Sequence, residues 1–169
     1  KKIYMIFKKK HNTELYNILL KLSRNIFFYK KIQLNDSFET RIFLMFFHFS
    51  ILMIIFKKKG GKFDQKEYDN VFNNIEYNLR ELGFGDVSVN KKMKDLNKIL
   101  YDILIKIKSN QSKNVFKLNH KMIFKYYNQL SHEKDTKFIK LEDYFSNFYG
   151  FCLKLPLDNM LKEFINFKF

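Results

Sequence analysis

Residues 42–56 read IFLMFFHFSILMIIF, a run in which His48 and Ser50 are the only polar side chains. Arg41 precedes the run and Lys57-Lys58-Lys59 follows it. A helix that crosses a bilayer needs about 20 predominantly apolar residues, so this run is short for a membrane span. A helix that is apolar on every side is expected in the centre of a domain, and a helix that dips into a membrane or is covered by a partner protein is the alternative. We therefore predict a buried central helix, with the rest of the chain packed around it.

Helical periodicity continues upstream of this run. The apolar residues of 14–24 recur every three or four positions, as on one face of a helix, and a short aromatic segment follows at 25–31. Asp36 and Glu39 have the spacing of a capping box, in which side chains satisfy free backbone N–H groups at the start of a helix. We predict that Asp36 opens the central helix and that Gly60-Gly61 ends it.

Downstream, Asp64 and Glu67 repeat the capping-box spacing, and the helix that they begin is expected to end at Gly83. A glycine adopts the left-handed conformation after a helix at little cost. Another helix is expected over 90–108, and a polar break follows it. Further helices are expected near 114–130, 140–151 and 157–167, the last opened by Pro156. The prediction is an all-α fold, a single compact multi-helix domain over residues 1–169.

The chain is strongly basic, with 32 Lys and Arg residues against 17 Asp and Glu and a formal net charge of +15. It contains no alanine and no tryptophan, and its positive residues are nearly all lysines, as expected of an AT-rich genome, so codon usage and selection for a polyanionic partner are alternative explanations of the charge. Lysine clusters at 8–10, 57–59 and 91–94, with aromatic residues between them, suit weak, salt-sensitive contact with RNA or with an anionic membrane surface. No nucleic-acid-binding motif accompanies them, so we expect no specific binding of DNA.

The sequence offers little for catalysis. Cys152 is the only cysteine, so neither an intramolecular disulfide nor a thiolate metal site is expected. Nucleophilic triads, phosphate-binding loops and metal-binding motifs are absent, and the apolar stretch at 3–7 is short for a secretory signal. His48 is expected to be a hydrogen-bonded histidine of the core or of an interface. The four histidines are scattered, at His11, His48, His120 and His132. We expect a protein without catalytic residues, metal or cofactor.

One stretch is more specific than composition. Residues 78–94 read NLRELGFGDVSVNKKMK, which resembles the signature of the ubiquinol–cytochrome c chaperone family. That signature has a helix ending in L-R-E-x-G, a G-x-G-D turn, and V-x-K-K-M-K opening the next helix. The matching residues are Leu79, Arg80, Glu81, Gly83, Gly85, Asp86, Val89, Lys91, Lys92 and Met93.

Weaker matches to the family lie upstream in the expected order. They are Leu15-Tyr16, Phe28-Tyr29, Asp36, Arg41-Ile42-Phe43 and His48. Of these, Tyr29, Asp36, Arg41 and His48 are taken as supporting site residues. Tyr101 fits the aromatic position of an F-Y-G-R element, but Asp102-Ile103 stand in place of its Gly-Arg. The resemblance covers a core at 14–108 and leaves a helical C-terminal extension at 109–169, where only residues 150–156 match faintly.

The resemblance implies a non-catalytic chaperone for assembly of the cytochrome bc1 complex (respiratory complex III), without a cofactor. Its implied partners are newly made cytochrome b, a small partner assembly factor and the ribosome near its tunnel exit. The implied location is the bacterial cytoplasm, at the inner face of the cytoplasmic membrane, with the matrix side of the mitochondrial inner membrane as the alternative. The alternative function is a basic helical protein of the ribosome or RNA, unrelated to bc1 assembly.

The motif has a structural and a functional interpretation. In the first, Gly83 and Gly85 allow two sharp bends and Asp86 or Ser88 accepts N–H groups of the next helix, which fixes the angle between two core helices. In the second, charged residues converge beside the turn and form a docking site for a partner or client. These are Arg80, Asp86, Lys91 and Lys92. Because a hydrophobic client needs exposed apolar surface, we predict that part of the 42–56 helix, or the groove beside it, is incompletely covered.

Overall fold

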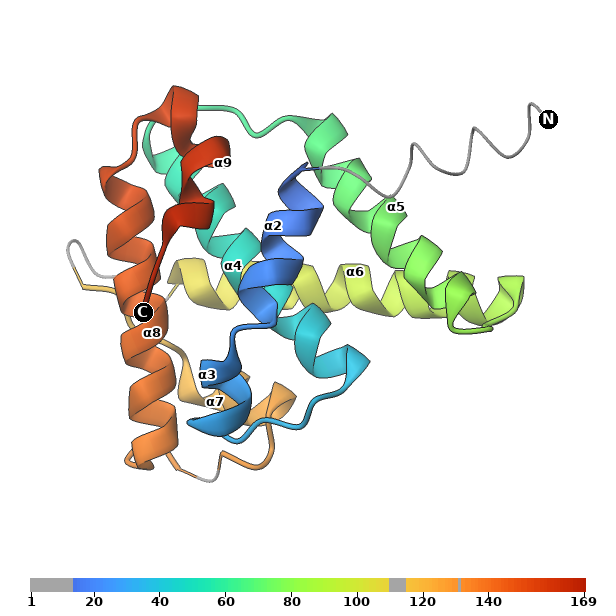
Figure 1. The fold of residues 1–169 in the computed structure, drawn as a ribbon, viewed down its shortest axis with the longest axis horizontal. Helices are drawn as coiled ribbons and strands as arrows, with labels where there is room; N and C mark the ends of the chain where they lie inside the picture. The colour runs from blue at the N-terminus through green and yellow to red at the C-terminus, as the bar shows by residue number, and fades with distance from the viewer. Residues whose placement is uncertain (1–13, 110–114, 131) are drawn as a thin grey trace.

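The computed structural model describes residues 14–109, 115–130 and 132–169 (Figure 1). This part of the chain is built from helices and contains no strand, which confirms the all-α prediction. The lysine cluster at 8–10 and the apolar stretch at 3–7 lie outside the described residues. The α-helices are α2 (Glu14–Ser23), α3 (Ile26–Lys30), α4 (Phe38–Lys58), α5 (Gln65–Glu81), α6 (Asp86–Ser109), α7 (His120–Tyr126), α8 (Thr136–Lys154) and α9 (Met160–Glu163).

The predicted central helix is α4, which runs through the middle of the molecule in Figure 1. It packs against α2, α6 and α8, so that its apolar faces meet three different helices. By length and composition it is the one helix in the described ranges that could cross a membrane, with a mean hydropathy of 1.7. However, 67% of the most apolar stretch of this helix, 18 residues long, is buried inside the structure, as expected of a core helix.

Aromatic side chains fill the space between α3, α4 and α8. The ring of Phe28 lies edge-on to Tyr144, with centroids 4.6 Å apart, and is itself fully buried. The chain end returns to the same cluster, because Phe167 packs against Tyr144 at 5.4 Å and Phe169 packs against Phe27 at 4.9 Å. Edge-on packing of this kind is favourable beyond the area that it buries. One continuous cluster of buried hydrophobic residues therefore extends from Leu15 to Phe167.

His48 is a buried polar residue at the centre of this cluster. Its Nδ1 lies 2.6 Å from the Leu44 carbonyl oxygen and its Nε2 lies 2.9 Å from the Tyr144 hydroxyl. Because a carbonyl can only accept, Nδ1 carries the proton, and the hydroxyl of Tyr144 donates to Nε2. Burial lowers the pKa of His48 to about 4, against the opposing effect of its hydrogen bond to Leu44. The prediction of a hydrogen-bonded core histidine is confirmed.

The start of α4 differs from the prediction. Ser37, not Asp36, is the N-cap residue, and its Oγ accepts the Thr40 backbone N–H at 3.2 Å. Asp36 instead accepts two hydrogen bonds from the Arg41 guanidinium, at 2.6 and 2.9 Å. The pairing with a neighbouring arginine thus outweighs the capping role that spacing alone suggested for Asp36. The predicted cap of α5 is correct, since Asp64 accepts the Lys66 N–H.

The bounds of the helices downstream of residue 109 also differ from the prediction. The helix expected over 114–130 is wrong in extent, because only α7 is helical there and 110–114 lie outside the described residues. Asn119 caps the start of α7 by accepting the Met122 N–H at 3.1 Å, and Tyr127 ends it. Conversely, α8 is longer than the helix expected over 140–151 and extends beyond both of its ends. After Pro156, the expected helix is divided into α9 and two short 3-10 turns, Leu157–Asn159 and Phe164–Asn166.

His48 should make the stability of the fold depend on pH. In the folded state its pKa of about 4 lies below the unfolded value of 6.5, so the unfolded chain takes up the proton first as the pH falls. The contribution is present above pH 6.5 and is lost progressively towards pH 4. We expect a loss of about 2 kcal/mol in the free energy of unfolding between about pH 7 and about pH 4.5 from this residue.

Chemical denaturation at both pH values measures this loss. The matched control is the double variant His48→Phe/Tyr144→Phe, which removes the titrating group and its partner together and leaves no unpaired polar atom of the pair. The wild type should lose about 2 kcal/mol more than the double variant on acidification. Equal losses in the two proteins would contradict the assignment.

Candidate functional site

The family-like motif forms a corner between α5 and α6, here called the glycine corner (residues 82–86). Gly83 follows Leu82, the C-cap residue of α5, and has φ 93°, as predicted. Its N–H donates to the Arg80 carbonyl at 3.0 Å, and the Phe84 N–H donates to the Leu79 carbonyl at 3.3 Å. These two bonds are the Schellman arrangement, which satisfies free carbonyls at a helix end and reverses the chain.

Gly85 has a different role from Gly83. Its φ does not lie in the left-handed region, and a Cβ at this position would meet nothing within 4 Å. Its carbonyl accepts the Val89 N–H at 2.9 Å, so Gly85 caps the start of α6, which begins at Asp86 rather than near residue 90. The second bend does not require a glycine. Val89 is fully buried and belongs to the core, whereas Met93 is partly buried against the core.

Charged groups of the motif meet across the corner. The Arg80 guanidinium forms an ion pair with Asp86, and it also donates to Glu76 at 3.0 Å. The Asp86 carboxylate is therefore paired with arginine, and its side chain is 83% exposed. Exposed ion pairs contribute little to stability, so this pair adds little to the backbone hydrogen bonds that order the corner. Of the charged residues that were predicted to converge beside the turn, Arg80 and Asp86 do so.

The lysines of the motif, Lys91 and Lys92, do not join this pair. Lys92 extends over the Phe84 ring, with Nζ 4.6 Å from the centroid. Lys91, the next residue along the helix, is exposed and forms no ion pair with the described residues. Glu81 is exposed beside the helix end. The lysines thus lie on different sides of α6, and only Lys92 faces the corner.

An apolar groove of about 360 Å³ lies beside the glycine corner. We call it the corner groove; its lining residues are Phe38, Glu39, Phe43, Leu79, Leu82, Phe84, Lys92, Asp95, Leu96 and Ile99. They come from the start of α4, the end of α5, the glycine corner and residues 92–99 of α6. Leu82 is 60% exposed and Phe84 is 38% exposed. The prediction that the groove beside the central helix is incompletely covered is therefore confirmed.

Sequence reasoning missed several of these groove residues. Phe84 lies at a position of the motif that the family leaves variable, and Phe38 precedes the first match in the central run. An aromatic residue between two glycines in a turn has few ways to become buried, and that signal could have identified Phe84. Phe38 and Ile99 carry no comparable signal, because only tertiary packing places them on the same groove.

The supporting residues do not line the corner groove and have structural contacts. The Tyr29 hydroxyl donates to the Ser23 carbonyl at 2.7 Å, which ties α3 to the end of α2. The Asp36–Arg41 pair brackets the start of α4, the turn that contributes Phe38 to the groove. His48 is enclosed in the core. These residues support the groove indirectly, by fixing the helices that form it.

The departure from the family at Asp102-Ile103 has a structural explanation. Ile103 is fully buried. Asp102 accepts hydrogen bonds from the Tyr126 hydroxyl and from Lys125 at 3.1 Å, and it pairs with Lys106 at 2.9 Å. Burial alone would raise the pKa of Asp102, but the hydrogen bonds from these three side chains lower it to about 2. In this chain the position anchors α7 to α6.

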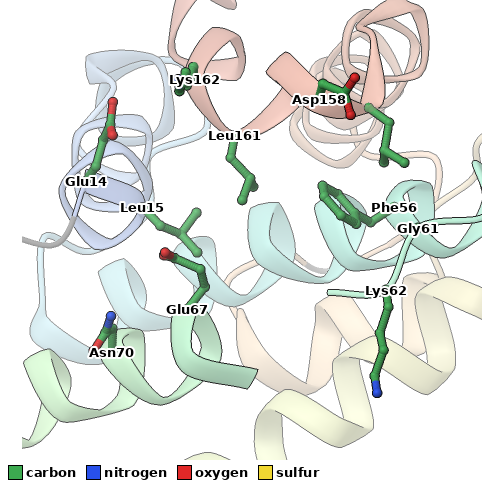
Figure 2. A pocket seen from close by; sticks show the side chains of 11 residues that line it. Glu14, Leu15, Phe56, Gly61, Lys62, Glu67, Asn70, Asp158, Leu161 and Lys162 are labelled. Atoms are coloured by element: carbon green, nitrogen blue, oxygen red, sulfur yellow. The ribbon is translucent and has the colours of Figure 1, made fainter. Parts of the chain in front are cut away.

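A second pocket, of about 540 Å³, lies between α2, α5 and the turn that precedes α9 (Figure 2). Leu15, Phe56 and Leu161 project into it. Its carboxylates, Glu14, Glu67 and Asp158, come from three different elements and are spread around the rim in Figure 2. No Ser, Thr, Cys or His residue lines it. Among the described residues, no three His, Cys, Asp or Glu side chains are grouped as a metal site would require.

The chain matches the model of a known protein family. A family model described as Ubiquinol-cytochrome C chaperone matches residues 30–120, which is more than half of the chain. The matched range contains the central helix, the glycine corner and the whole of α6. No curated protein and no solved structure matches the chain.

The two glycines of the corner should respond differently to the same substitution. We expect Gly83→Ser to lower the free energy of unfolding by about 1 kcal/mol or more, because a Cβ is strained in the left-handed region. Gly85→Ser should leave stability unchanged or raise it, since serine is a favourable N-cap residue and has room here. Denaturant titration of both variants measures the difference; an equal loss at the two positions would contradict this account.

Proposed function

The chain belongs to the ubiquinol–cytochrome c chaperone family, and on this premise we propose that it is a non-catalytic assembly chaperone of the cytochrome bc1 complex. We further propose that its client is newly made cytochrome b and that the corner groove is the client-binding site. Family membership supports the assembly role. The corner groove supports the mode of binding.

The observation that carries this proposal is the exposed apolar surface at the family motif. Leu82 and Phe84 remain accessible although the rest of the corner is tightly ordered by hydrogen bonds. A rigid wall beside an open apolar groove loses little conformational entropy when a ligand binds. A groove of about 360 Å³ accommodates a few side chains of one segment, as when a helix inserts anchors spaced three or four residues apart.

The rim of the groove suits an apolar segment with polar flanks. Glu39 and Asp95 lie at the rim and form no ion pairs with other described residues. Lys92 lies over the Phe84 ring and adds a positive group. A hydrophobic client whose polar ends carry opposite charges would meet complementary groups there. The groove has no converging acid, base or nucleophile, which supports binding rather than catalysis.

In this proposal the protein works on the side of the membrane where cytochrome b is made. That side is the cytoplasmic face of the bacterial membrane or, alternatively, the matrix face of the mitochondrial inner membrane. A small partner assembly factor and the ribosome near its tunnel exit are further partners that the proposal includes. The competing function, a ribosome or RNA protein unrelated to bc1, predicts salt-sensitive co-sedimentation with ribosomes and normal bc1 levels after deletion of the gene.

Phe84→Asp tests the proposal, because it places a charge in the groove without removing a buried side chain. We expect at least a tenfold loss in co-purification of cytochrome b, about 1.4 kcal/mol, and a corresponding fall in assembled bc1 complex. The matched control is Ile139→Asp, which changes a 52% exposed residue of α8 outside the groove. Both variants should unfold within about 1 kcal/mol of the wild type.

The measurements are affinity purification from membranes solubilised in mild detergent, and the cellular level of assembled complex. Cytochrome b binding that survives Phe84→Asp would exclude the corner groove as the client site. Normal bc1 levels in a strain that lacks the gene would exclude the assembly function itself.

A further inference from the structure

A second apolar groove lies at the other end of the central helix. It has a volume of about 420 Å³, and we call it the lysine groove; its lining residues are Met53, Ile54, Lys57, Lys58, Leu104 and Lys108. They come from the last turns of α4 and of α6, which pack against each other. The floor is aliphatic, and every charged side chain that lines the groove is a lysine.

The positive charge around the lysine groove is not neutralised by neighbouring carboxylates. Lys57 and Lys108 form no ion pair with the described residues, and no Asp or Glu lines the groove. Lys58 donates to the Tyr149 hydroxyl at 3.2 Å, which is an uncharged partner. Lysines in the last turn of a helix interact favourably with the helix dipole, and this explains why the helix ends are basic. It does not explain why an aliphatic floor stays open between the lysines.

The aliphatic surface continues from the groove onto the outer face of α6. Ile105 follows Leu104 in the chain and is 62% exposed, and Tyr101, one turn earlier, is 56% exposed. Residues three and four positions apart are neighbours on a helix, so Tyr101, Ile105 and Lys108 share one face. Exposed apolar and aromatic side chains beside lysines are the pattern of a surface that lies in the headgroup region of a membrane.

We propose that the lysine groove and the adjoining face of α6 bind the surface of an anionic phospholipid membrane. The ammonium groups of Lys57, Lys58 and Lys108 bind lipid phosphates, and the aliphatic floor contacts the first part of an acyl chain. Each lysine near an anionic membrane contributes about 1 kcal/mol, so a few of them suffice for reversible binding when apolar contacts add to them.

RNA is the other polyanion that a basic surface could bind, but the lining of the groove favours lipid. Single-stranded RNA is bound by several aromatic rings, on which successive bases stack, and by arginine; the groove is lined by neither, and the adjoining face of α6 adds one exposed ring, Tyr101. Aliphatic side chains between lysines offer no stacking surface, whereas they match an acyl chain.

The location of the groove leaves the corner groove free. From Phe43 to Lys57 the rise along α4 is about 20 Å, so the two grooves lie at opposite ends of the central helix. A molecule bound to the membrane through the lysine groove would still present the glycine corner. The lipid proposal rests on the lysine groove and the adjoining face of α6 and does not depend on the proposed function.

Vesicle co-flotation of the full chain tests the proposal. The probes are vesicles of phosphatidylcholine alone and vesicles that contain about 30% phosphatidylglycerol, with poly(U) RNA as a separate polyanion. The wild type should bind the anionic vesicles at least tenfold more tightly than the neutral ones, with a loss of affinity at high salt. Binding of poly(U) without binding of anionic vesicles would overturn the proposal and assign the surface to RNA.

Two variants and a control locate the binding surface. Lys57→Glu/Lys108→Glu should lower affinity for anionic vesicles at least tenfold, and Ile105→Asp should lower it at least threefold. The control, Lys121→Glu/Lys140→Glu, makes the same change in net charge at exposed positions of α7 and α8 and should change affinity less than threefold. All of these side chains are exposed, so thermal unfolding should be nearly unchanged. Equal losses in the groove variant and the control, or unchanged binding by Ile105→Asp, would overturn the proposal.

Discussion

A helix that is apolar around its whole circumference must be surrounded, and this constraint organises the protein. No single neighbour can cover α4, so α2, α6 and α8 each pack against one of its faces. With so few helices, coverage is complete in the middle of α4 and incomplete at its ends. Both grooves lie there, one at the start of α4 and one at its last turns, each against α6. The demand for burial and the presence of open apolar surface therefore have the same origin.

The polar pair inside this core joins parts of the chain that are distant in sequence. His48 lies in the segment that matches the family, whereas Tyr144 lies in the C-terminal part beyond the matched range. A buried imidazole or hydroxyl loses its hydrogen bonds to water. The hydrogen bond between His48 and Tyr144 replaces them for both side chains. The aromatic rings of α3, α8 and the chain end enclose the pair. The C-terminal helices are in this sense required by the central helix.

The glycine corner combines order and exposure. Backbone hydrogen bonds and the left-handed Gly83 fix the turn, and the Arg80–Asp86 pair links the two helix ends. The same turn holds Leu82 and Phe84 outside the core, where packing alone would not retain them. Such exposed apolar residues on a rigid support are unfavourable for the isolated protein and useful for binding another chain. This gives a physical basis for a chaperone whose specific motif lies at a corner between helices.

Local sequence determined the elements: apolar periodicity predicted the helices, the unbroken run at 42–56 predicted the buried one, and Gly83 and Asp64 ended and began helices as expected. Local sequence could not decide which of two adjacent residues caps α4, since Asp36 and Ser37 are both favourable N-cap residues. In the structure Asp36 pairs with Arg41 and Ser37 is the cap. Local sequence also could not show that Phe38 and Ile99 line the same groove. Periodicity and capping act within a few residues of the chain, whereas burial depends on which distant helices cover a side chain. For that reason both grooves became visible only in the tertiary structure.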